Sequence, residues 1–125
     1  MSAGVWVRPA RPAVSWLWLM LVWPLAALAH AHLQRSDPAD GAVISNMPAQ
    51  LTLQFSEAAQ LTALTLSKAG QTVPQKLAPL PSAAATQLQV TAPRLEPGDY
   101  ELRYRVISAD GHIMAGKIHF TVTAR

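Results

Sequence analysis

Alternation of apolar and polar residues marks several short segments in the second half of the chain. It runs through residues 51–55, 87–90, 100–106 and 116–122, and more loosely through 61–66. In that last segment the alternation slips at residues 63–64. A period of two puts every second side chain on the same face, which is typical of a half-buried strand. The pattern therefore predicts strands that each turn one face toward a core.

Turn signals separate these segments, at residues 37–41, 69–70, 96–98 and 110–111. Seven prolines between residues 30 and 125 leave little room for helices of ordinary length. Short strands at such spacing indicate an all-β sandwich or barrel. The candidate core residues are the apolar members of three alternating segments: Leu51, Leu53, Phe55, Leu102, Tyr104, Val106, Ile118, Phe120 and Val122.

The start of the chain has a different composition. Arg8 and Arg11 precede an unbroken apolar run at residues 16–29, which is shorter than the roughly 20 apolar residues of a bilayer-spanning helix. A basic segment, a short apolar run and the small-x-small ending Ala27-Leu28-Ala29 are features of a secretory signal peptide. We therefore expect residues 1–29 to be a signal peptide and residues 30–125 to be one exported domain.

Two alternatives to cleavage before His30 stay open. Cleavage after Ala31 would leave His32 first, although it puts a large polar histidine inside the recognised stretch. The apolar segment could also be kept as an uncleaved N-terminal anchor.

Charge and cysteine content exclude several classes of function. The formal net charge of +3 falls to +1 without Arg8 and Arg11, so the chain has no basic footprint for nucleic acid. The sequence has no cysteine, which excludes disulfide scaffolds, zinc ribbons and cysteine nucleophiles.

Potential metal ligands occur in three separate parts of the expected domain. A new N-terminus at His30 would offer an α-amine and an imidazole from one residue, a pair that suits Cu, Ni or Zn. Asp110 and His112 lie two residues apart in a predicted loop, and Glu57 follows the alternating segment 51–55. Composition alone does not bring these groups together.

In this order the residues resemble the CopC family, the periplasmic copper-binding proteins of copper resistance and homeostasis. The resemblance is carried by His30-Ala-His-Leu33, by Phe55-Ser56-Glu57 and by the segment 104–122, which contains Ser108-x-Asp110-x-His112. It covers essentially all of residues 30–125. It implies a cupredoxin-like Greek-key β-sandwich or barrel of seven to eight strands.

The resemblance also implies a site and a role. One Cu(II) per chain would bind in a histidine brace, formed by both nitrogens of His30 and by His112, with Asp110 and Glu57 completing or flanking the site. The implied protein is a periplasmic monomer that is not an enzyme. It sequesters copper or passes it to a partner, for which an inner-membrane copper protein is one candidate. Only Met47 and Met114 follow the leader, so we expect no dedicated methionine site for Cu(I).

Other interpretations compete with this one. A histidine brace also occurs in copper monooxygenases, but here two carboxylates would crowd the copper and residues 30–125 contain no tryptophan to stack on a sugar. A metal-free interaction sandwich is a third possibility. His32 could bind Cu(II) as the third residue of a free His-Ala-His terminus, and we interpret His119 as a structural residue of an exposed strand face.

Overall fold

The computed structural model describes residues 3–6, 9 and 31–124. Most of the expected signal peptide, and His30 with it, lies outside these residues. None of the described segments forms a helix that is long and apolar enough to cross a membrane.

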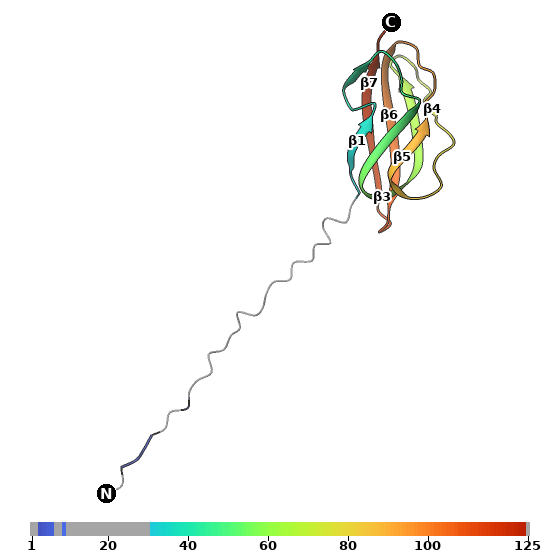
Figure 1. The fold of residues 1–125 in the computed structure, drawn as a ribbon. Helices are drawn as coiled ribbons and strands as arrows, with labels where there is room; N and C mark the ends of the chain where they lie inside the picture. The colour runs from blue at the N-terminus through green and yellow to red at the C-terminus, as the bar shows by residue number, and fades with distance from the viewer. Residues whose placement is uncertain (1–2, 7–8, 10–30, 125) are drawn as a thin grey trace.

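Seven strands make up the domain (Figure 1). Their bounds are β1 Leu33–Asp37, β2 Ala42–Ile44, β3 Gln50–Lys68, β4 Gln75–Lys76, β5 Ala85–Thr91, β6 Gly98–Ser108 and β7 Ile113–Val122. This confirms the all-β prediction, with seven strands where seven to eight were expected.

The two segments predicted at 51–55 and 61–66 belong to one strand, β3, which has 19 residues. The slip in the alternation corresponds to a β-bulge, because the pairing of β3 with β6 shifts register between Leu61 and Ala63. A bulge adds one residue to one strand of a pair and so interrupts the period of two. As a result Leu61, Leu64 and Leu66 all stay buried while Ala63 is exposed.

β3 holds the two layers of the domain together. Its first part pairs antiparallel with β1 and β5, through residues 50–55, whereas residues 59–68 pair with β6 and residues 65–66 with β4. β7 pairs antiparallel with β6, and β2 closes the far edge parallel to β7. The sheet order is β1-β3-β6-β7-β2, so one continuous sheet folds over itself where β3 passes from one layer to the other.

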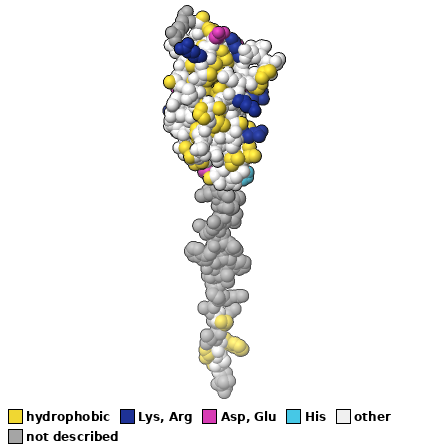
Figure 2. Space-filling model, turned by 90° about the vertical axis from the view of Figure 1, so that its right-hand side faces the viewer, with side chains coloured by type: hydrophobic (Ala, Val, Ile, Leu, Met, Phe, Trp, Pro, Cys, Tyr) yellow, Lys and Arg dark blue, Asp and Glu magenta, His cyan; other side chains and the backbone are white. Residues whose placement is uncertain are grey.

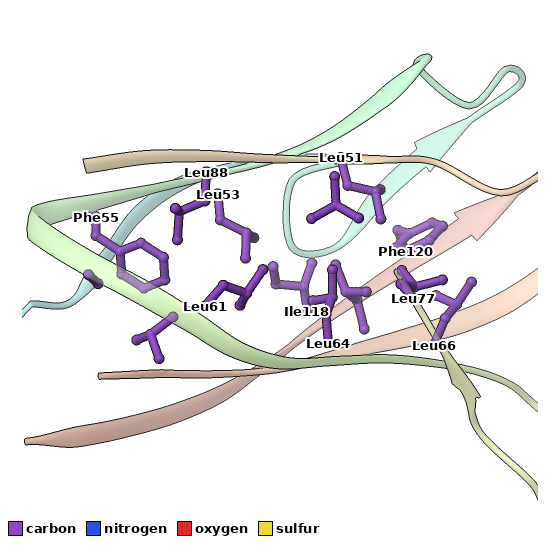
Figure 3. Packing of buried hydrophobic residues seen from close by; sticks show 14 of the residues in the cluster. Leu51, Leu53, Phe55, Leu61, Leu64, Leu66, Leu77, Leu88, Ile118 and Phe120 are labelled. Carbon is purple, nitrogen blue, oxygen red and sulfur yellow. The ribbon is translucent and has the colours of Figure 1, made fainter. Parts of the chain in front are cut away.

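The core lies between these layers. In Figure 3, Leu51, Leu53, Phe55 and Leu88 face Leu61, Leu64, Leu66 and Ile118 across the interior. Eight of the nine predicted core residues are buried; the exception is Tyr104, which is half-buried and packs its ring edge-to-face on Phe55. Burying one such apolar side chain contributes about 1.5–3 kcal/mol to the free energy of unfolding, so this cluster is the main source of the stability of the domain.

One end of the barrel gathers the segments that carry the candidate ligands. The described domain begins at this end, and the turn between β6 and β7 lies there too (Figure 1). The backbone confirms the arrangement, because the Ser56 amide donates to the His32 carbonyl oxygen (2.9 Å) while Ala59 pairs with Ser108. Residues 56–59 of β3 thus run between the N-terminal segment and the β6–β7 turn.

Candidate metal centre

The β6–β7 turn is a tight hairpin built around a glycine. The Gly111 amide donates to the Ser108 carbonyl oxygen (2.9 Å), and the Ser108 amide donates to the His112 carbonyl oxygen (2.9 Å). Gly111 has φ of 86°, a left-handed conformation that side chains disfavour. A short hairpin loop with glycine in the left-handed conformation is a common connection between two strands. It lets Asp110 and His112 project from the same short loop.

Asp110 and His112 are in direct contact. One carboxylate oxygen, Oδ2, lies 2.7 Å from His112 Nδ1, and the other, Oδ1, accepts the His112 amide at 3.3 Å. Oδ1 also accepts a hydrogen bond from the hydroxyl of Ser108, a side chain that is only 3% exposed. The buried Ser108 therefore holds Asp110 in place, and Asp110 in turn holds the imidazole of His112.

These contacts favour the charged form of Asp110. The hydrogen bond from Ser108, followed by those from His112, lowers the pKa of Asp110 to about 2 despite an opposing effect of desolvation. Asp110 is then a carboxylate at neutral pH and can accept a proton-bearing Nδ1 of His112. With the proton on Nδ1, the lone pair of the ring is on Nε2, which points away from Asp110. A carboxylate that orients an imidazole in this way is common around metal-binding histidines.

The N-terminal segment is fixed to β3 by His32 and Ser56. The His32 amide donates to Ser56 Oγ (3.0 Å), and His32 Nδ1 lies 3.2 Å from the same hydroxyl. Ala31, one residue earlier, is fully buried in the core. The chain is thus held in a defined position up to the residue that follows His30, and His30 itself lies outside the described residues.

Glu57 lies on β3, next to Ser56, with an exposed side chain. It is two residues before Ala59, where pairing with Ser108 begins, so it belongs to the same end of the barrel as Asp110 and His112. Within residues 31–124 it makes no ion pair. Of the four predicted ligands, the structure brings two into contact and a third to the same end.

The described residues do not assemble a complete metal site by themselves. Nowhere in the described part of the chain do three or more His, Asp or Glu side chains form a group that could hold a metal ion. The pair Asp110–His112 offers one imidazole nitrogen and carboxylate oxygens, a donor set that suits Cu(II). A full coordination set needs a further group.

Two serines that support the site were not assigned a role from the sequence. The hydroxyl of Ser108 donates to Asp110, the carboxylate partner of His112. The hydroxyl of Ser56 accepts a hydrogen bond from the amide of His32. The available signal was a serine two residues before Asp110, a position from which a hydroxyl can reach local side-chain and backbone groups.

Comparison with known proteins identifies the family of this chain. The CopC domain family matches residues 33–123. This chain belongs to the CopC family. Members of the family bind copper and are generally not enzymes.

Similar proteins support the assignment over most of the chain. Copper resistance protein C of Xanthomonas campestris pv. juglandis is 37% identical over 107 residues, covering 78% of this chain and 83% of that protein. Protein YobA of Escherichia coli K12 is 33% identical over 120 residues, covering 92% of this chain and 95% of that protein. The crystal structure of CopC from Methylosinus trichosporium OB3b shares the fold, with a TM-score of 0.64 at 23% identity over 77% of this chain and 96% of that one.

Proposed function

We propose that this CopC-family chain is a periplasmic Cu(II)-binding protein of copper homeostasis. Residues 1–29 act as a signal peptide, and its removal makes His30 the first residue. One Cu(II) is then bound by the amine and imidazole of His30 and by the imidazole of His112. The protein stores this copper or passes it to a partner.

The contact between Asp110 and His112 is the observation that best supports the proposal. It orients an exposed imidazole at the end of the barrel where the N-terminal segment also arrives. Asp110 holds the His112 ring and adds negative charge beside a dication. Glu57 contributes further negative charge from the same end.

The contacts of His32 argue against a different copper site at the terminus. Binding through the third residue of a free His-Ala-His terminus needs the His32 amide nitrogen in deprotonated form, together with Nδ1. In the structure that amide donates to Ser56 Oγ, and Nδ1 lies beside the same oxygen. Copper in that mode would have to displace both contacts of His32 with Ser56.

Native mass spectrometry of the protein purified from cells that express the full chain tests the proposal. We expect a mass that begins at His30 and one Cu(II) retained against competing Zn(II). His30→Ala should lose this copper, whereas the matched control His32→Ala should keep it. A mass that begins at His32, or a His30 terminus that takes up no copper, would overturn the proposal.

A further inference from the structure

The outer face of the β6–β7 hairpin carries an exposed apolar pair beside the candidate metal centre. Odd-numbered residues of both strands point outward, as their exposure shows. Ile107 and Ile113 are direct cross-strand partners on this face, 36% and 62% exposed. They immediately flank the loop that contains Asp110 and His112. A protein that covers this pair therefore also reaches the loop.

Basic side chains follow the apolar pair along the same face. Arg105 lies next to Ile107, and Arg103 and Lys117 face each other one step further along. Arg103 forms an ion pair with Glu101. Within residues 31–124, neither Arg105 nor Lys117 forms an ion pair.

This concentration of positive charge does not follow from the overall composition. Residues 31–124 contain seven Lys and Arg and seven Asp and Glu, so the described domain is formally neutral. Three of the seven basic residues, Arg103, Arg105 and Lys117, nevertheless lie in two neighbouring cross-strand pairs on the outer face of β6 and β7. Figure 2 shows Lys and Arg side chains along one edge of the domain, with apolar side chains and a histidine at the lower end of that edge.

Small residues leave a hollow between the basic side chains. Ala63, Thr65, Ala115 and Gly116 line it together with Tyr104 and with Arg103, Arg105 and Lys117, and its volume is about 490 Å³. Basic side chains around a floor of small residues and the half-buried Tyr104 can receive acidic side chains from another molecule. The strand backbone below makes the surface rigid before any partner arrives.

From these features we propose that the outer face of β6 and β7 docks an acidic protein partner in copper transfer. The partner presents Asp or Glu side chains to Arg105 and Lys117 and an apolar side chain to Ile107 and Ile113. This inference rests on the proposed function, because it takes the adjacent loop to hold the copper. Opposite charges speed the encounter of two proteins without requiring a long-lived complex, which suits transfer of a metal.

The chemistry of the face favours a protein over a lipid surface. Protein segments that insert into a membrane interface usually present Trp, Phe or Leu side chains together with basic residues. The outward residues of β6 and β7 include no Trp, Phe or Leu, the two isoleucines lie at one end only, and the Tyr104 ring that lines the hollow is half-buried. A hollow between charged side chains fits discrete acidic side chains better than a fluid layer of headgroups.

Nuclear magnetic resonance of the metal-free, 15N-labelled domain tests docking separately from copper binding. The probe is a short peptide of alternating Glu and Leu, compared with the same peptide carrying Gln in place of Glu. We expect the Glu peptide to shift the amides of Ile107, Arg105, Ile113 and Ala115, with an effect that weakens at high ionic strength. The Gln peptide should leave them unchanged.

Charge reversal sharpens this test. The double variant Arg105→Glu/Lys117→Glu should lose the shifts, whereas Arg35→Glu/Lys76→Glu, which changes the charge equally on exposed residues of β1 and β4, should keep them. Equal shifts with both peptides, or shifts that map to another face, would overturn the proposal. So would binding to phosphatidylglycerol vesicles without binding to the Glu peptide, which would assign the face to lipid.

A transfer experiment links the face to copper. The acceptor is each peptide extended by an N-terminal copper-chelating sequence, and the donor is the copper-loaded protein. We expect transfer to the Glu acceptor to be about tenfold faster than to the Gln acceptor at low ionic strength, and the charge-reversed variant to remove this difference. Peptide binding without copper uptake would refute the proposed function alone. Copper uptake with equal transfer to both acceptors would refute the docking face alone.

Discussion

Two histidines of this domain contact carboxylates in nearly the same way, yet they are suited to different tasks. His112 Nδ1 lies 2.7 Å from Asp110, and His119 Nε2 lies 2.9 Å from Glu101. Both imidazoles are more than half exposed, at 59% and 55%. Distance and exposure therefore do not distinguish His112, the proposed ligand, from His119, which we interpret as structural.

The difference lies in the other ring nitrogen and in the backbone around each residue. His119 sits within β7, and its Nδ1 is 3.9 Å from Asp40, so carboxylates face both sides of the ring. Its amide also donates to Asp40 (2.8 Å), which ties β7 to the turn before β2. His112 instead stands on a loop at the end of the barrel, with Asp110 on its Nδ1 side. A contact between a histidine and a carboxylate therefore does not by itself indicate a metal site, and the position of the histidine in the fold has to be considered as well.

The largest expected contrast is between alanine variants of these two histidines. His112→Ala should weaken Cu(II) binding by more than about 100-fold, beyond the range typical of groups that only support a ligand. His119→Ala should change it by less than about twofold. Competition titrations against a copper chelator measure both. A similar loss of Cu(II) affinity in both variants would contradict the different roles proposed for His112 and His119.

The next contrast concerns the carboxylates. Asp110→Asn keeps the shape of the side chain but removes its charge, and we expect Cu(II) affinity to fall about 10- to 100-fold. Glu101→Gln, which makes the equivalent change beside His119, should leave the affinity unaltered. An unchanged affinity for Asp110→Asn would mean that the contact with His112 is structural only.

A smaller effect is expected from the serine beneath the loop. Ser108→Ala removes the largest contribution to the low pKa of Asp110, so the pKa of that carboxyl should rise toward its ordinary value. Protonated Asp110 supports His112 less well, so copper should be released at a higher pH than from the wild type. Absorbance of the Cu(II) complex during acid titration measures this. Ser56→Ala, at the other serine of this end, should leave the pKa of Asp110 unchanged.

The smallest effect concerns stability around His119. The pKa of Glu101 is lowered chiefly by its hydrogen bond with Arg103, and also by its bond with His119. A lowered pKa in the folded state stabilises the protein above the unfolded value of Glu, and this contribution is lost as pH falls through the folded value. Glu101→Gln should therefore lower Tm by a few degrees at most at neutral pH, with the difference vanishing in acid. Thermal unfolding followed by circular dichroism checks this, and a difference that grows on acidification would contradict the stated cause.

Much of the fold could be predicted from the spacing of apolar residues. The segments 100–106 and 116–122 alternate because one face of each strand is buried, and the structure confirms them as parts of β6 and β7. The strands β1, β2 and β4 escaped the same reasoning. β2 and β4 have three and two residues, too few to display a period, and β1, which reads Leu-Gln-Arg-Ser-Asp, contains only one apolar residue.

The sequence pattern also could not predict that β3 passes from one layer of the domain to the other. Residues 56–60 read Ser-Glu-Ala-Ala-Gln, which has no alternation, and nothing local shows that the strand continues through them. Their extended conformation depends on partners that are distant in sequence. Ser56 pairs with His32, whereas Ala59 pairs with both Ala85 and Ser108.

The sequence by itself determined the class of fold, the exposed and buried faces of the longer strands, and the identity of the candidate ligands Asp110 and His112. The class of fold and the strand faces depend on periodicity, which is a local property, whereas the choice of Asp110 and His112 also depends on the resemblance to the CopC family. Only the tertiary structure decided which carboxylate contacts which histidine nitrogen, and that Ser108 and Ser56 support this end of the barrel. Hydrogen bonds need atoms placed within about 3 Å of one another. Strand pairing and turn geometry set that placement between segments far apart in the chain.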